Sequence, residues 1–214
     1  MKILRVATAP EVLVATDELA AALARGPAHP GDALAAQGLP AWRARELLGA
    51  RALLRSLLAE VEPGAHSAAL ATEAAGRPLL PEWPGLCVSL SHDGGTVAAA
   101  VGRCRRVGVD VQTPPAWVTE AMIRRCLRQQ ASSLQRLDEA GRGVELAWVW
   151  TVQEACVKAQ GTGIAGRPWT IDVPPGRSSG RWGRYAWTAL RAHSTIPLSC
   201  AYSLRHACAE AVRR

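Results

Sequence analysis

The stretch 150–161, WTVQEACVKAQG, places a glutamate and a lysine on one face of a predicted helix. Glu154 and Lys158 stand at positions i and i+4, where helical side chains are neighbours. Trp150, one turn earlier on the same face, indicates a packed site rather than an open surface. Lys158 is the only lysine after Lys2, and a lysine supplies a mobile point charge and a proton that arginine does not. The alternative interpretation of this pair is an ordinary surface ion pair.

The composition is that of a globular chain with a surplus of positive charge. Its 214 residues suffice for one large domain or two small ones, and 49% of them are hydrophobic against 20% charged, which excludes a disordered chain. The net charge of +7 favours an anionic partner such as a phosphorylated small molecule, an acidic protein, nucleic acid or a membrane surface. No apolar run is long enough to span a bilayer, so we expect no membrane partner.

The cysteines and the first residues bear on the compartment. None of the six cysteines forms a C-x-x-C pair, which argues against zinc and thioredoxin-like sites. The opening MKILRVATAPEVLVATDE reaches proline and acidic residues too early for a secretory signal. We therefore expect a cytoplasmic protein with reduced thiols.

Hydrophobic periodicity predicts both helices and strands along the chain. Strands are expected at 2–8, 87–92, 96–102 and 107–112, and in the tail at 169–173, 184–190 and 198–204. Helices are expected at 15–24, 42–60, 117–139 and 144–160, with a loop at 26–40. The turn Asp93-Gly94-Gly95 is typical of a hairpin.

The strand VGVDVQ, residues 107–112, carries two polar side chains among valines. Asp110 and Gln112 are two residues apart, so they project from the same face of the strand. Their oxygens suit a hard cation such as Mg²⁺. The alternative is that Asp110 caps the Thr-Pro-Pro turn that follows.

Several residues upstream are suited to binding an anion. Ser91 and His92 end a strand at a Gly-rich turn, whose backbone N–H groups are free to meet an anion. Arg77 lies in a tight turn, and Arg43 and Arg51 lie two turns apart on one helix, where each can reach a phosphate. The alternatives are a structural histidine and a solvated basic face.

In this order the motifs resemble a known family. They are a basic helix, GRPLLP (76–81), SLSHDGG (89–95), GVDVQ (108–112) and WTVQEACVKAQG (150–161). The series is similar to that of the 4′-phosphopantetheinyl transferases of the surfactin-synthetase-activating (Sfp) type, over about residues 43–163. The separation of the last two motifs is the specific part of this resemblance, and the upstream arginines are not specific.

The resemblance implies a fold and an activity. The fold would be α+β, with two pseudo-symmetric α/β lobes and the active site between them. The first lobe, 1–105, would lie on the coenzyme A side, and the second, 106–214, would carry the metal and catalytic residues. The activity would transfer the phosphopantetheine arm of coenzyme A to a serine of an acyl or peptidyl carrier protein, using Mg²⁺ or Mn²⁺ and releasing adenosine 3′,5′-bisphosphate. Members of this form usually act as monomers.

The resemblance also assigns roles by position. Asp110 and Glu154 would bind the metal, Glu154 would be the general base, and Lys158 would neutralise charge or donate a proton at the leaving phosphate. Asp110 and Lys158 would also face coenzyme A. The remaining coenzyme A contacts would be Arg43, Arg51, Arg77, Ser91 and His92.

Two positions depart from the family pattern. Gln112 replaces the second acidic residue of the strand motif; its amide oxygen is still a metal ligand, but a neutral one. Gln153 stands where many members have lysine. These departures leave open a non-catalytic homologue that only binds coenzyme A or a carrier.

The other alternative is a basic nucleic-acid-binding module, using Trp182, Tyr185 and Trp187 beside nearby arginines. Retention of Asp110, Glu154, Lys158 and His92 together favours an active enzyme without a nucleic-acid partner.

Overall fold

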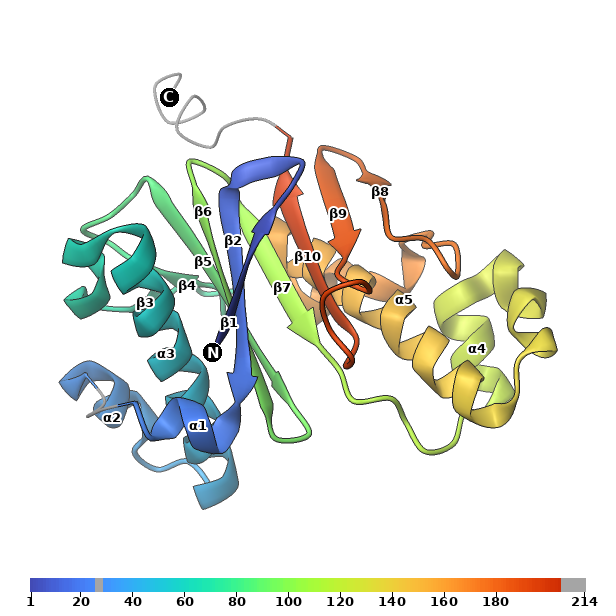
Figure 1. Ribbon diagram of the computed structural model, residues 1–214, viewed down its shortest axis with the longest axis horizontal. Helices are drawn as coiled ribbons and strands as arrows, with labels where there is room; N and C mark the ends of the chain where they lie inside the picture. The colour runs from blue at the N-terminus through green and yellow to red at the C-terminus, as the bar shows by residue number, and fades with distance from the viewer. Residues whose placement is uncertain (26–28, 205–214) are drawn as a thin grey trace.

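The computed structural model, which describes residues 1–25 and 29–204, is an α+β fold built around two antiparallel sheets (Figure 1). The first sheet has the strand order β1-β2-β6-β5-β4-β3, and the second has the order β7-β10-β9-β8. Figure 1 shows the helices on the outer sides, with α1, α2 and α3 beside the first sheet and α4 and α5 beside the second. The α+β class predicted from the sequence is confirmed.

The first sheet is formed entirely by residues before 104. Its strands are β1 (Lys2–Val6), β2 (Ala9–Glu18), β3 (Ala71–Thr72), β4 (Pro78–Leu79), β5 (Leu86–Asp93) and β6 (Thr96–Arg103). The helices on this side are α1 (Leu19–Leu23), α2 (Pro30–Ala36) and α3 (Ala41–Val61), followed by the short η1 (Pro63–Ser67). Leucines on one face of α3 are fully buried against the sheet, which explains why this helix was predicted correctly from its periodicity.

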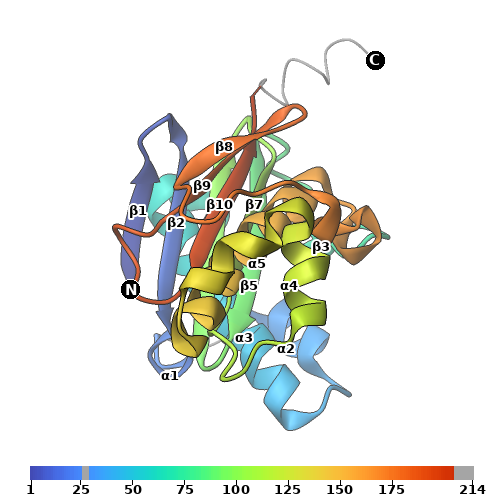
Figure 2. The same cartoon turned by 90° about the vertical axis from the view of Figure 1, so that its right-hand side faces the viewer.

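The second sheet and its helices follow. The strands are β7 (Val107–Val111), β8 (Ser179–Trp182), β9 (Tyr185–Ala189) and β10 (Leu198–Ser203). The helices are α4 (Glu120–Leu127), η2 (Arg128–Arg136), α5 (Glu139–Gln160), η3 (Gly163–Gly166) and η4 (Pro168–Thr170). Figure 2, viewed from this side, shows α4 and α5 together with the second sheet. No helix in the described residues is long and apolar enough to cross a membrane.

The two sheets pack face to face, so the molecule has four layers. Valines and alanines of β2 and β6 form one core with Val107, Val109, Val111 and Leu198 of the second sheet. The outer face of the first sheet is covered by α3, and that of the second by α5. Polar bridges also join the sheets: Ser89 Oγ accepts a hydrogen bond from Val109 N at 3.0 Å. The end of β7 is therefore fixed against β5.

Glycine permits the closest approach between a strand and a helix. A Cβ atom added to Gly108 would lie 2.0 Å from the carbonyl oxygen of Ala155 and 2.5 Å from the amide nitrogen of Ala159. Residue 108 must therefore be glycine for β7 to lie directly on α5. This contact sets the distance between the Asp110 strand and the Glu154 helix.

Some predicted elements are wrong, each for a local reason. Residues 15–18, expected to be helical, extend β2 because they pair with β6, and the helix begins only at Leu19. The loop expected at 26–40 contains α2, which starts on Pro30 and is capped by the His29 side chain; residues 26–28 lie outside the described part. No strand forms at 169–173, where η4 stands instead, while β8 was not predicted.

Two further expectations need correction. The helix expected at 117–139 is split into α4 and η2, because Arg128 has a positive φ of 51° that ends the α-helix. Reduced thiols were expected throughout, but Cys104 is disulfide-bonded. The other four cysteines of the described residues are free thiols.

Candidate active site

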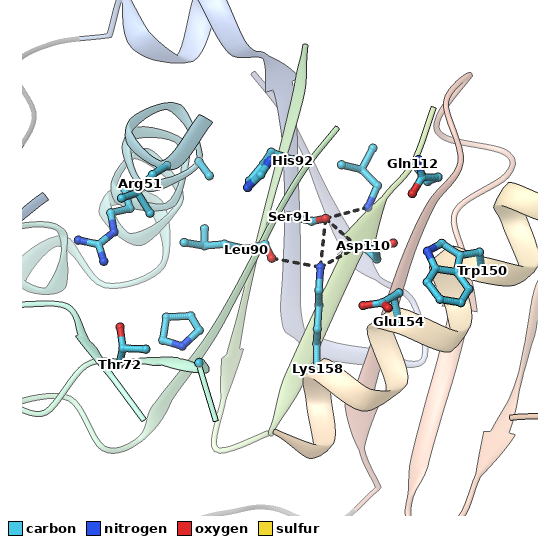
Figure 3. A pocket seen from close by; sticks show the side chains of 15 residues that line it. Arg51, Thr72, Leu90, Ser91, His92, Asp110, Gln112, Trp150, Glu154 and Lys158 are labelled. Atoms are coloured by element: carbon cyan, nitrogen blue, oxygen red, sulfur yellow. Dashed lines mark hydrogen bonds and ion pairs between the residues drawn. The ribbon is translucent and has the colours of Figure 1, made fainter. Parts of the chain in front are cut away.

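The largest predicted cluster of polar residues lines one cavity of about 530 Å³. Its walls come from α3, β5, β7 and α5, so both sheets and both long helices contribute to it (Figure 3). Seven of the nine predicted site residues line it: Arg51, Ser91, His92, Asp110, Gln112, Glu154 and Lys158. Trp150 lines it as well, as its position on the Glu154 face indicated.

Asp110 lies at the centre of a compact polar cluster. Its Oδ1 accepts hydrogen bonds from Lys158 Nζ at 2.6 Å and from Ser91 Oγ at 2.7 Å. Lys158 Nζ also lies 3.1 Å from Ser91 Oγ and 3.2 Å from the carbonyl oxygen of Val109. Asp110 is only 6% exposed, so its charge is balanced by Lys158 in a largely dry environment. The lysine therefore holds α5 to both β5 and β7.

Glu154 is half-buried beside this cluster and is not held by it. Its carboxylate takes part in no hydrogen bond or ion pair with any of the described residues, and Figure 3 shows it between Asp110 and Trp150. Burial raises the pKa of Glu154, the nearby negative charge of Asp110 raises it further, and Lys158 lowers it. A raised pKa brings a carboxylate toward the range where it acts as a general base near neutral pH.

The donor set in this cavity fits a hard divalent cation. Two carboxylates, Asp110 and Glu154, repel each other there, and a cation would relieve that repulsion. The Gln112 side chain lines the same cavity with an amide oxygen, the kind of ligand that Mg²⁺ accepts beside water. Within 1–25 and 29–204 no group of three or more His, Cys, Asp and Glu side chains is placed to hold a metal. A site here would thus use two carboxylates and an amide.

A buried ion-pair cluster holds one arginine at the cavity wall. Asp32 of α2 is 2% exposed and bonds Arg51 Nη1 at 2.9 Å, and it also bonds Arg55 through Nε and Nη2. Burial alone would raise the pKa of Asp32, but the hydrogen bonds and charges of the two arginines outweigh it and lower the pKa. One carboxylate faces two guanidinium groups, so the cluster keeps one net positive charge beside the cavity.

The other residues predicted to bind an anion lie in three different places. His92 Nδ1 lies 3.3 Å from Glu46 Oε2. Arg77 pairs with Glu73 and lines an adjoining cavity of about 190 Å³, which Lys158 also borders. Arg43 is exposed on α3 and is not among the residues that line the 530 Å³ cavity, so its predicted contact with coenzyme A stays a prediction.

Comparison with known families decides the identity of the chain. Residues 30–102 match the model of the 4′-phosphopantetheinyl transferase N-terminal domain, and residues 106–200 match the 4′-phosphopantetheinyl transferase superfamily. The chain belongs to the 4′-phosphopantetheinyl transferase family. Members of this family transfer phosphopantetheine from coenzyme A to carrier proteins. A search of curated proteins found no match.

Gln153 of this transferase does not face the cavity. Its Nε2 donates hydrogen bonds to the carbonyl oxygens of Cys126 and Ile171, both at 2.8 Å, and the residue is fully buried. The side chain therefore joins α5 to the end of α4 and to the segment after η4. Gln153 thus contacts the protein interior and is not among the residues that line the cavity.

Sequence reasoning missed two carboxylates that support the site. Asp32 lay in a segment expected to be a loop, so nothing marked it as a partner of Arg51. Asp93 was taken only as a turn residue, yet its Oδ2 bonds both Gln112 and Thr113. The motifs that contain Ser91, Asp110 and Lys158 could be recognised in the sequence. The contacts that join residues of distant elements could not.

Proposed function

We propose that this transferase is of the surfactin-synthetase-activating type and works in the cytoplasm as a monomer. It moves the phosphopantetheine arm from coenzyme A to a serine of an acyl or peptidyl carrier protein, with Mg²⁺, and releases adenosine 3′,5′-bisphosphate. The observation that carries this proposal is the convergence of Asp110, Glu154 and Lys158 on one cavity at the junction of the two sheets. We assign the coenzyme A side to 1–105 and the catalytic side to 106–214.

Metal binding is assigned to Asp110, Glu154 and Gln112. Mn²⁺ is expected to substitute for Mg²⁺ because both accept oxygen ligands. When bound, the ion neutralises the pyrophosphate of coenzyme A and lowers the barrier to its cleavage. Asp110 keeps Oδ2 for this purpose, since its Oδ1 is occupied by Ser91 and Lys158.

Glu154 is assigned the role of general base. It takes the proton of the carrier serine, directly or through a water, while the serine oxygen bonds to the phosphorus that carries the pantetheine arm. The bond from that phosphorus to the bridging oxygen breaks, and adenosine 3′,5′-bisphosphate leaves with the electron pair. Positioning and charge neutralisation supply most of the rate enhancement in such a transfer. The raised pKa of Glu154 suits this role.

Lys158 and the basic wall are assigned to the phosphates. Lys158 exchanges its weakest contact, 3.4 Å to the carbonyl oxygen of Leu90, for a phosphate oxygen and neutralises or protonates the leaving group. Arg51 and His92 face the same cavity and bind coenzyme A phosphates, with Ser91 beside them, while Arg77 binds from the adjoining cavity.

The carrier is assigned to a groove next to the cavity. This groove of about 350 Å³ is lined by Pro115, Met122 and Leu146, and it shares Gln112 and Trp150 with the catalytic cavity. An apolar side chain on a carrier helix would fill it within reach of Glu154. Arginines of the 113–135 segment (Arg124, Arg125 and Arg128) would meet acidic residues on that helix.

The carrier assignment predicts a charge effect. Arg124 is the arginine to change, because its side chain is 68% exposed, whereas Arg125 stacks on Trp169 and Arg128 bonds the Thr170 carbonyl oxygen. Arg124→Glu should raise the KM for carrier severalfold and leave coenzyme A binding unchanged, with Arg181→Glu on β8 as the control. An unchanged KM for carrier would refute this surface.

The transfer itself is tested by its second product. Incubation of the protein with coenzyme A, an apo carrier and Mg²⁺ should release adenosine 3′,5′-bisphosphate in a ratio of one to each holo carrier formed. Chelation of divalent ions should stop both products. Coenzyme A binding without either product, across several carriers, would favour the non-catalytic homologue.

The nucleic-acid alternative needs Tyr185 and Trp187 on the surface, but both side chains are buried.

A further inference from the structure

The side-chain amide of Gln112 is held in one orientation. Its Nε2 donates hydrogen bonds to Asp93 Oδ2 at 3.1 Å and to the carbonyl oxygen of Thr113 at 3.3 Å. Both partners are acceptors only, so a reversed amide would place Oε1 against two oxygens. Nitrogen therefore faces Asp93, and Oε1 is the atom left for other partners.

Oε1 of Gln112 remains available on the cavity side. No donor among the described residues bonds this oxygen, and Gln112 lines the catalytic cavity together with Asp110 and Glu154. Figure 3 shows Gln112 beyond Asp110 on the same strand, on the side of Trp150 and Glu154. An oriented carbonyl oxygen beside two carboxylates is a suitable third ligand for a hard cation.

Asp93 is itself fixed by the strand end that it contacts. Its Oδ2 also accepts a hydrogen bond from the backbone N of Thr113 at 2.6 Å. The hairpin turn packs closely on the same residue, since a Cβ added to Gly94 would lie 2.0 Å from Thr113 Oγ1. The turn of the first sheet is thus clamped onto the end of β7 in the second, and Asp93 cannot turn away without breaking this clamp.

From this geometry we propose that Asp93 is a positioning residue, which turns the Gln112 amide oxygen toward the cation. The proposal rests on the proposed function, in which Gln112 is a metal ligand. It also explains why residue 112 is neutral in this chain. A glutamate there would bring a second carboxylate against Asp93 Oδ2, at the place now occupied by Nε2. Asp93 and Gln112 therefore form a matched pair.

A cycle of four proteins tests this pairing: the wild type, Asp93→Ala, Gln112→Glu and the double variant. Asp93→Ala removes the oxygen that accepts from Gln112 Nε2, so Asp93 no longer holds the amide with Oε1 toward the cation. Gln112→Glu alone should suffer repulsion from Asp93. The double variant lacks that repulsion, and the lost contact with Thr113 is common to both proteins without Asp93, so it cancels in the comparison.

Two measurements that need no turnover are made on each protein. The first is the melting temperature without metal, which Gln112→Glu should lower in the wild type and not in Asp93→Ala. The second is the affinity for Mg²⁺ in the presence of coenzyme A, by calorimetry. Asp93→Ala should weaken it about tenfold, as the loss of a residue that orients a metal ligand usually does, and the double variant, with a charged ligand at position 112, should restore it.

The outcomes separate the pairing from the function. Additive effects of the two substitutions on melting temperature, or an unchanged Mg²⁺ affinity in Asp93→Ala, would overturn the positioning role of Asp93. Failure of the wild type to bind Mg²⁺ would overturn the metal assignment, and with it this role, even if the melting temperatures were coupled. Coupled melting temperatures together with weaker Mg²⁺ binding support the proposal.

Discussion

Two carboxylates of the cavity differ in how the protein holds them. Asp110 is bonded by Ser91 and Lys158, whereas Glu154 has no such partner within the part of the chain described. The hydroxyl and ammonium groups therefore hold the first in place, whereas burial raises the pKa of the second, which makes its charged form costly. A group that weakens the metal-free fold and faces a cavity is typical of a functional site.

This difference predicts an effect of pH on stability. The pKa of Glu154 is raised in the folded state above its ordinary value near 4.5. As pH rises past that value, Glu154 therefore keeps its proton in the folded protein but loses it in the unfolded protein. The wild type therefore loses stability across this window, and Glu154→Gln does not. The variant should melt higher than the wild type at pH 7 without metal, and the difference should vanish near pH 4. A difference in melting temperature that does not change with pH would show that burial does not raise the pKa of Glu154.

At this scale the sequence predicted pairings within an element but not between elements. The i, i+4 spacing placed Glu154 and Lys158 on one face, and strand alternation placed Asp110 beside Gln112. The contacts of Lys158 with Ser91 and of Asp93 with Gln112 join segments far apart in the sequence. Local periodicity carries no information on such contacts.

At the scale of elements, the short helix α2 is joined to the long helix α3 by a buried ion-pair cluster. The helix α2 is attached to α3 by Asp32, whose carboxylate bonds Arg51 and Arg55. Sequence reasoning read this segment as a loop because glycine, proline and alanine dominate it, and tertiary pairing overrode that composition. Strong periodicity did predict α3 and the β5–β6 hairpin, whose turn glycines both have positive φ.

The attachment of α2 predicts a large loss on removal of one side chain. Asp32→Ala leaves two poorly exposed arginines facing each other, which should lower the free energy of unfolding by about 3 kcal/mol or more. Denaturant unfolding of the metal-free protein measures this loss. Adding Arg55→Leu to the variant should recover part of it by removing one unpaired charge. A loss within the range of surface substitutions would show that the cluster contributes little.

At the scale of the molecule, the cavity proposed as the active site depends on how the two sheets meet. Helix α3 and strand β5 supply Arg51, Ser91 and His92, while β7 and α5 supply Asp110, Glu154 and Lys158. Gly108 lets β7 lie on α5, and the serines of β5 bond the backbone of β7. The family resemblance implied this two-part arrangement; composition and periodicity alone did not, because neither specifies how the faces of two sheets combine.

The most direct test of the central claim, that this cavity transfers phosphopantetheine, is the intact mass of an apo carrier protein after incubation. The reaction contains the transferase, coenzyme A and Mg²⁺, and it is repeated with Glu154→Gln and with the control Glu139→Gln, an exposed position on the same helix. The account predicts a gain of one phosphopantetheine arm with the wild type and the control and none with Glu154→Gln. Equal gains with all three proteins would contradict it.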